Sequence, residues 1–499
     1  MSAQPNLVVI LTDDQGPWAM GCAGNDELRT PHIDSLAARG VRLDRFHCSS
    51  PVCSPARASL LTGRIPSSHG IQDWLRKGNV QDPDGRYRGF DRPVEYLAGI
   101  KGYSDYLSDH GYTCALSGKW HMGASETPQK GFSHWYAHGF GGGSYYGAHM
   151  IRDGRIYEEP EYVTDAIAAD AVTFLSTVDT AKPFHLSVHF TAPHSPWSRE
   201  NHPAELYDEY LHHCSFESVP NPPAHRWSLH HERWNIATKR RELLAGYFAA
   251  VTAMDAAVGR IVAELDRRGL RESTLVVFTS DNGMNMGHHG VWGKGNGTFP
   301  MNMYDTSVQV PFIASMPGTV PEGGVSHVMT SQYDVLPTVL DFLQVPYEPD
   351  GDLPGRSFAS TLRGSDDPAA TDDEQVVVFD EYGPVRMIRT ADWKYVHRYP
   401  YGPNELYNLA DDPGENENLY EYGVSASGEP SAESRYGRII REMRARMEDW
   451  FLRYADPATD GCRSNVTGLG QVDFCDTRRT WPQSFVGPVD VELARVEDD

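Results

Sequence analysis

The chain alternates short apolar runs with segments whose apolar positions recur at helical spacing. Four runs predict buried strands, and each is followed by polar residues: 6–11, 113–116, 184–190 and 273–279. Helical periodicity or helix-ending glycines predict helices between and after them, at 30–40, 103–112, 164–178, 241–268 and 331–343. Strands that alternate with helices in this way predict an α/β fold.

The pattern changes after the acidic stretch 366–374, which we interpret as a boundary. Because 499 residues exceed one ordinary core, we expect an N-terminal domain over 1–365 and a smaller subdomain over 375–456. The tail, 457–499, has little periodicity and is expected to be irregular, wrapping the domain or a second copy of the chain in a homo-oligomer. The subdomain's predicted elements are short strands at 376–379, 386–389 and 394–396 and a helix at 436–454.

Three polar or glycine-rich segments interrupt this pattern. Residues 71–101 contain an Asp-Pro-Asp-Gly turn and predict a surface excursion. Residues 132–146 have two open interpretations, an irregular packed loop or a rim that stacks sugar or aryl rings. Residues 201–239 hold irregularly spaced histidines and predict a solvated loop. Aromatic residues expected near such a rim are Trp74, Trp135, Tyr145, Tyr146 and Trp197.

Composition and charge narrow the classes of partner. The formal net charge of −24 argues against nucleic acid and against an anionic membrane, because either partner requires a basic face. The sequence contains no apolar run long enough to span a bilayer. The apolar run at 6–11 lacks a basic leader and a cleavage site, so we expect a cytoplasmic protein, or an exported one whose leader has been removed. The seven cysteines are scattered without disulfide or zinc spacing.

Oxygen-bearing side chains follow two of the predicted strands. Asp13 and Asp14 come directly after the run at 6–11, and Asp281 and Asn282 come after the run at 273–279. Ligands in α/β sheets bind at the carboxyl ends of strands, and adjacent carboxylates suit a hard divalent cation. Taken alone, an Asp-Asp pair is more often a solvated turn.

Cys53 precedes a proline and a run of good helix formers, so it is predicted to lie at the start of a helix that runs from about Pro55 towards Thr62. The unpaired N–H groups of a helix start favour an anion or a thiolate there. The alternative for an isolated cysteine is a buried, inert thiol.

The sequence Cys53-Ser-Pro-Ala-Arg57, followed by Ala-Ser-Leu-Leu-Thr-Gly, resembles the signature of the type I sulfatases of the alkaline phosphatase-like superfamily. Three further segments resemble motifs of that family: Gly-Lys119-Trp-His121-Met-Gly, Pro-His194-Ser-Pro, and Gly-Lys294-Gly. The sequence departs from the family pattern after Lys294, with Asn-Gly-Thr at 296–298 and Tyr-Asp-Thr-Ser at 304–307. The resemblance extends from Asn6 to about Leu419.

The resemblance implies a large, mixed, mostly parallel sheet sandwiched by helices, with a smaller C-terminal antiparallel sheet. It also implies a sulfuric ester hydrolase that cleaves a carbohydrate or aryl sulfate monoester, with a formylglycine nucleophile made from Cys53 by a maturation enzyme. The implied metal is Ca²⁺, with Mg²⁺ as the alternative, since an all-oxygen set disfavours zinc. The implied metal ligands are Asp13, Asp14, Cys53, Asp281 and Asn282, and the implied catalytic residues are Cys53, Arg57, Lys119, His121, His194 and Lys294.

Other functions stay open at this point. Phosphonate monoester and phosphodiester hydrolases share the fold and the formylglycine signature, so the motifs do not separate a sulfuryl from a phosphoryl substrate. A non-catalytic anion-binding protein and a hydrolase with a cysteine nucleophile are the remaining alternatives. The leaving-group acid is left open between His194 and Lys294.

Overall fold

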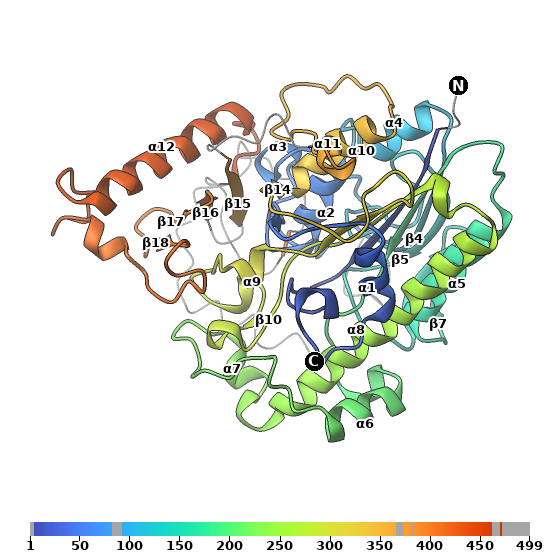
Figure 1. The fold of residues 1–499 in the computed structure, drawn as a ribbon, viewed down its shortest axis with the longest axis horizontal. Helices are drawn as coiled ribbons and strands as arrows, with labels where there is room; N and C mark the ends of the chain where they lie inside the picture. The colour runs from blue at the N-terminus through green and yellow to red at the C-terminus, as the bar shows by residue number, and fades with distance from the viewer. Residues whose placement is uncertain (1–3, 82–91, 366–373, 381–383, 462–469, 472–499) are drawn as a thin grey trace.

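The core of the computed structural model is a ten-stranded mixed sheet (Figure 1). The structure describes residues 4–81, 92–365, 374–380, 384–461 and 470–471. Strands β9, β1, β8, β4 and β5 are parallel neighbours, whereas β12, β6 and β7 are antiparallel to their neighbours. In sheet order, the strands are β13 (Gly324–Ser326), β2 (Val41–Leu43), β12 (Phe312–Ser315), β9 (Thr274–Ser280), β1 (Asn6–Thr12), β8 (Phe184–His189), β4 (Thr113–Lys119), β5 (Phe132–His138), β6 (Ala148–Arg152) and β7 (Arg155–Glu159).

The four strands in the middle of the sheet end at nearly the same level. In the register of the sheet, Leu11 lies beside His189, Thr12 beside Ser280, and Gly118 beside His189. Because these strands are parallel, the residues that follow them emerge together at one edge.

Helices cover both faces of the sheet, and β1 shows why. Leu7 and Val9 belong to one buried apolar cluster and Val8 and Ile10 to another, since successive side chains of a strand point to opposite faces. The first cluster includes residues of α2 (Cys53–Thr62), α4 (Tyr103–Asp109) and α10 (Val335–Phe342). The second includes residues of α1 (Pro31–Ala38), α5 (Val163–Thr177) and the long helix α8 (Ile236–Arg267). The predicted α/β fold is confirmed.

A separate four-stranded antiparallel sheet follows, shown in brown and orange in Figure 1. Its strands are β15 (Val376–Asp380), β16 (Val385–Arg389), β17 (Trp393–Arg398) and β18 (Glu405–Asn408), and α12 (Arg435–Tyr454) packs on it. Ile440, Met443, Met447 and Phe451 of α12 are buried at this contact, spaced as one helix face requires. No helix in the described parts of the chain has both the length and the apolar character needed to span a membrane.

The remaining described helices and strands are short connections. The paired strands are β10 (Asn285–Met286) with β11 (Trp292–Gly293), and β3 (Phe46–His47) with β14 (Thr330–Ser331). The helices are α3 (Pro66–His69), α6 (Ala204–His213), α7 (His230–Arg233), α9 (Asp305–Val308) and α11 (Ala359–Leu362).

Three local predictions were wrong. Residues 71–81 are not a surface excursion, because Ile71, Leu75 and Val80 are buried. Residues 201–239 are not wholly a loop, since α6 packs on α8 through Tyr207 and Tyr210. The first half of 132–146 is neither an irregular loop nor a rim, because β5 occupies 132–138. Residues 82–91, 366–373 and most of the tail lie outside the described residues.

Candidate active site

Four adjacent strands deliver polar side chains to the shared edge of the sheet. Asp13 and Asp14 follow β1, and Asp281 follows β9. Lys119 is the last residue of β4, and His194 lies on the loop after β8. All except His194 are buried. The alignment of the strand ends therefore brings together residues that are far apart in the sequence.

Helix α2 brings the cysteine to the same place. Cys53 is the first helical residue, two positions earlier than predicted, and every residue of α2 is buried. Arg57 lies one turn further on, where its Nε donates to Asp281 Oδ2 over 2.9 Å and its Nη1 donates to the Lys119 carbonyl over 3.1 Å. The helix thus directs Cys53 and Arg57 to one site.

Three cations and three carboxylates form pairs in this buried space. Lys119 pairs with Asp13, and Arg57 pairs with Asp281. The Nζ atom of Lys294 lies 2.5 Å from Asp14 Oδ1 and 2.9 Å from Cys53 Sγ. Asp14 raises the pKa of Lys294 well above its usual value even though burial lowers it. Pairing is what makes so many buried charges tolerable.

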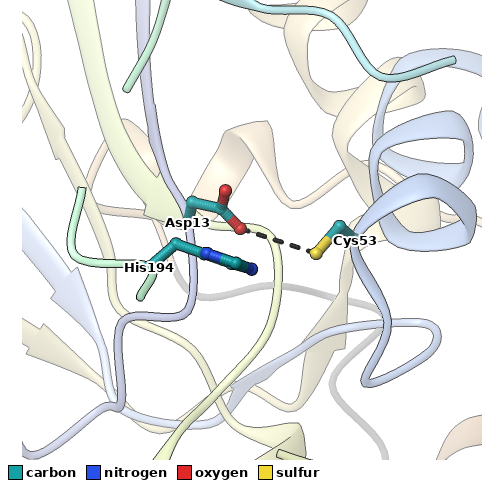
Figure 2. Close-up of side chains that lie close together, drawn as sticks. All are labelled: Asp13, Cys53 and His194. Carbon is teal, nitrogen blue, oxygen red and sulfur yellow. Dashed lines mark hydrogen bonds between the residues drawn. The ribbon is translucent and has the colours of Figure 1, made fainter. Parts of the chain in front are cut away.

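Cys53 is a thiol in this setting and not the thiolate that a helix start favours. Its Sγ lies 3.5 Å from Asp13 Oδ1, and Figure 2 shows the His194 ring directed towards the space beside both groups. Burial raises the pKa of Cys53 to about 12, outweighing the opposing effects of Lys119 and Lys294. The expectation of an activated thiolate was therefore wrong, which counts against a cysteine nucleophile.

The two histidines present different nitrogen atoms. His121 Nε2 donates to the Leu75 carbonyl over 3.2 Å, so the neutral ring carries its lone pair on Nδ1. Among the described residues, no hydrogen-bond partner reaches that buried Nδ1. Burial, with Lys119 and Arg57, holds the pKa of His121 well below its usual value. His194 Nδ1 donates to the Ser195 carbonyl over 2.7 Å, and its Nε2 lies 3.7 Å from Asp14 Oδ2.

A glycine loop lies against both histidine rings. A Cβ atom on Gly141 would lie 2.3 Å from His121 Cε1, and one on Gly142 would lie 3.2 Å from His194 Cε1. Tyr145 donates its hydroxyl to the His194 carbonyl over 2.7 Å. The predicted aromatic rim therefore needs correction, because Tyr145 and Trp197 are buried core residues.

The carboxylates can hold a divalent cation. Asp13, Asp14 and Asp281 each offer an oxygen within 4.8 Å of the others, and the set Asp13, Cys53 and His194 meets the same limit. Asn282 directs its amide nitrogen to Asp14 Oδ1 over 2.7 Å, and its amide oxygen accepts from Lys294 Nζ over 3.4 Å. An oxygen-rich donor set of this kind fits Ca²⁺ or Mg²⁺.

Two supporting groups escaped the sequence analysis. Gln332 donates to the Asp281 carbonyl over 2.7 Å and accepts from the Ser49 N–H over 3.0 Å, which fixes the loop that carries Asp281. The carbonyl of Leu75 holds His121. A buried backbone carbonyl leaves no signal in the side-chain pattern, so the contact with Leu75 could not be predicted.

Comparison with known proteins identifies the family. The sulfatase family model matches residues 5–345, and a model named N-sulphoglucosamine sulphohydrolase, C-terminal, matches residues 287–442. The chain is 26% identical to the N-acetylglucosamine-6-O-sulfatase of Bacteroides thetaiotaomicron, with 92% of this chain and 88% of that protein covered.

Two solved structures share the fold. One, of a protein in complex with its substrate D-glucosamine-2-N,6-O-disulfate, has a TM-score of 0.69 at 24% identity and covers 92% of this chain and 99% of that chain. The phosphonate monoester hydrolase of Agrobacterium radiobacter has a TM-score of 0.65 at 20% identity and covers 94% of this chain and 99% of that chain. The fold alone thus does not separate the two chemistries, but the family model spans more than half of the sequence. The chain belongs to the sulfatase family of the alkaline phosphatase-like superfamily, and it is a sulfuric ester hydrolase.

Proposed function

We propose that this protein hydrolyses a sulfate monoester of a carbohydrate, using the hydrate of a formylglycine made from Cys53. The observation that carries the proposal is the position of Cys53 between Lys294 and Asp13, at the start of a buried helix and beside paired cations. The names of the relatives support a sugar substrate, since one is an N-acetylglucosamine-6-O-sulfatase and one was solved with a sulfated glucosamine.

In the first step, one hydroxyl of the hydrate gives its proton to a neighbouring carboxylate, of which Asp13 lies 3.5 Å from the residue 53 sulfur, and attacks the sulfur atom of the substrate. A new sulfur–oxygen bond forms as the bond from sulfur to the sugar oxygen breaks, and the leaving alkoxide takes a proton. His194 and Lys294 are the two candidates for that acid, because both lie beside residue 53. Lys119, Lys294 and Arg57 are placed to stabilise the charge on the sulfate oxygens.

In the second step, His121 takes the proton of the remaining hydroxyl. The carbon–oxygen bond to sulfate then breaks, the aldehyde reforms and sulfate leaves; water adds to the aldehyde to restore the hydrate. A neutral ring with a free lone pair suits this role, and Nδ1 of His121 has that character. A sulfated thiol has no second hydroxyl, so unmodified cysteine could not complete the cycle.

A divalent cation fits beside these groups. Asp13, Asp14, Asp281 and Asn282, with the oxygen of modified residue 53, would hold Ca²⁺, with Mg²⁺ as the alternative. When bound, the cation supplies positive charge to the sulfate oxygens and to the nucleophile.

A mass spectrum of the peptide that contains Cys53, paired with assays on an aryl sulfate and an aryl phosphodiester, tests the proposal. We expect an aldehyde at residue 53, dominant sulfate release, and loss of turnover in Cys53→Ala. Dominant diester cleavage would move the protein to the phosphonate and phosphodiester branch. An unmodified thiol in active enzyme would overturn the mechanism.

The metal is tested separately by chelation. Removal of divalent cations should abolish sulfate release, and added Ca²⁺ should restore it, with Mg²⁺ run in parallel. Full activity in the chelated protein would contradict the proposed cation site.

A further inference from the structure

The backbone of Leu75 connects the nucleophile helix to His121. Its N–H donates to the hydroxyl of Ser54, the neighbour of Cys53, over 3.1 Å. Its carbonyl accepts the Nε2 hydrogen of His121 over 3.2 Å. Leu75 and Ser54 are buried, so neither contact competes with bulk water. One residue therefore sets both the position of the helix start and the tautomer of the histidine.

Gln471 pairs with the backbone on either side of Leu75. Gln471 forms an isolated parallel bridge with Leu75. The N–H of Gln471 donates to the Trp74 carbonyl over 2.8 Å, and its carbonyl accepts from the Arg76 N–H over 3.0 Å. Residues almost 400 positions apart in the sequence are thus joined as neighbouring strands would be.

The side chain of Gln471 fixes the preceding turn. Its Oε1 accepts from the N–H of Gln72 over 2.8 Å and of Asp73 over 3.4 Å, and its Nε2 donates to the Gly70 carbonyl over 2.9 Å. Both ends of the amide are therefore used, which only glutamine or asparagine can provide.

Gly470 is the residue that lets the tail approach. Its φ of 78° lies in the left-handed region, and an added Cβ would lie 2.7 Å from Trp74 Cε2. The contact of Gly470 and Gln471 with residues 70–77 therefore depends on the glycine at 470, which allows the left-handed backbone and the close approach to Trp74, as well as on the hydrogen bonds of Gln471.

We propose that Gln471 is a positioning residue of the reaction, which holds the Leu75 carbonyl against His121. The inference rests on the proposed function, in which His121 serves the second step. Without the Gln471 side chain, the turn at 70–73 loses the amide bonds to Gly70, Gln72 and Asp73, so the main-chain pairing beside Leu75 loses its support and His121 loses its fixed orientation. A misplacement of about 1 Å can reduce a rate by up to about 100-fold.

The test is rapid-mixing kinetics of phenol release from an aryl sulfate by the matured full-length enzyme. In Gln471→Ala, the first turnover should keep its wild-type rate, because sulfur attack does not use His121. The steady-state phase should slow about 10-fold or more, leaving a burst of one phenol per active site. For the same reason kcat and KM should fall together, with kcat/KM little changed.

Two further variants separate positioning from stability. Both Gln471→Ala and Gln471→Glu keep the backbone pairing, but only Gln471→Glu keeps a side-chain acceptor for the N–H groups of Gln72 and Asp73, so it should slow the second phase less than alanine does. Gln375→Ala removes a partly buried glutamine that bonds Arg446 over 2.8 Å, away from residues 70–77, and should leave both phases unchanged.

The outcomes separate the positioning role of Gln471 from the proposed function, in which His121 acts in the second step. If Gln471→Ala and Gln471→Glu lose both phases equally, or neither, the positioning role is wrong. If His121→Ala slows the second phase and the Gln471 variants do not, the inference alone fails. If His121→Ala leaves the second phase at its wild-type rate, the proposed function fails and this inference with it.

Discussion

At the scale of single residues, the balance of charge around Cys53 is the feature with the clearest consequences. Lys294 is buried and contacts Asp14, Cys53 and Asn282. Removing it leaves Asp14 without its closest cation in a space that excludes water. An uncompensated buried charge costs far more than an intact pair contributes.

Lys294→Ala is therefore expected to lose turnover and also stability. In the metal-free protein the free energy of unfolding should fall by about 3–5 kcal/mol, the usual cost of breaking a buried pair. Added Ca²⁺ should recover part of the loss, because a cation beside Asp14 replaces the missing charge. Thermal unfolding with chelator and with Ca²⁺ measures both effects.

Lys182→Ala is the matched control, since Lys182 is exposed and precedes β8, at the opposite end of that strand from the loop that carries His194. It should change neither the melting temperature nor its response to Ca²⁺. A Lys294→Ala protein that melts as the wild type does in chelator would contradict the charge-balance argument.

At the scale of elements, the strands also bury ionisable groups that take no part in the proposed reaction. His185 lies in β8 with no exposed surface, and its Nε2 lies 3.0 Å from the Ser187 hydroxyl. Burial lowers the pKa of His185 to about 3. In the unfolded chain the same ring takes up a proton below about pH 6.5.

Because the pKa of His185 differs between the folded and the unfolded state, the free energy of unfolding depends on pH. Because the unfolded state binds the proton and the folded state does not, His185 supports folding above pH 6.5 and loses that support as the pH falls from 6.5 towards 3. Compared with His185→Asn, the wild type should lose about 1.4 kcal/mol more per pH unit in that window. Urea unfolding at pH 7.5 and pH 5.5 measures the difference, and an unchanged difference between the two proteins would refute it.

The elements also show how far the sequence could be interpreted. The strands at 6–12 and 274–280 were predictable because a strand buried on both faces leaves a continuous apolar run, and the strand at 184–189 because its apolar and polar residues alternate with the period of a strand. The candidate ligands at their ends followed directly. Residues 71–81 were wrongly predicted to lie at the surface. They are covered by His121 and Gln471, which are distant in sequence and contact the backbone of this segment, so its side-chain pattern does not reveal them. The glycines at 141 and 142 indicated a loop, but the sequence did not show that their lack of a side chain leaves room for the rings of His121 and His194.

At the scale of the whole molecule, a buried charged cluster joins the two sheets. Lys394 of β17 donates to the Met303 carbonyl over 2.9 Å and pairs with Asp305 and Glu415. Arg389 of β16 adds a contact to Asp305 over 3.1 Å. Asp305 begins α9, beside the loop that carries Lys294, so the cluster links the C-terminal sheet to the surroundings of the site.

We expect Lys394→Ala to weaken this link. The wild type should unfold in one calorimetric transition, whereas the variant should lose about 3–5 kcal/mol and show the C-terminal sheet melting earlier. Arg444→Ala, which removes an exposed pair with Glu448, should cost less than about 1 kcal/mol. A single, unshifted transition in Lys394→Ala would mean that the cluster does not couple the sheets.

The burial of Cys53 limits the period in which a maturation enzyme could reach it. Cys53 is 4% exposed in the folded protein, so the maturation enzyme that the proposed function requires would have to reach the segment before α2 packs. Gln471, which helps to close that region, leaves the ribosome roughly 400 residues after Cys53. At about 5–20 residues per second, translation leaves an interval of roughly 20–80 s in which the segment is made but its last contacts are not. The fraction of active molecules would then depend on the speed of synthesis.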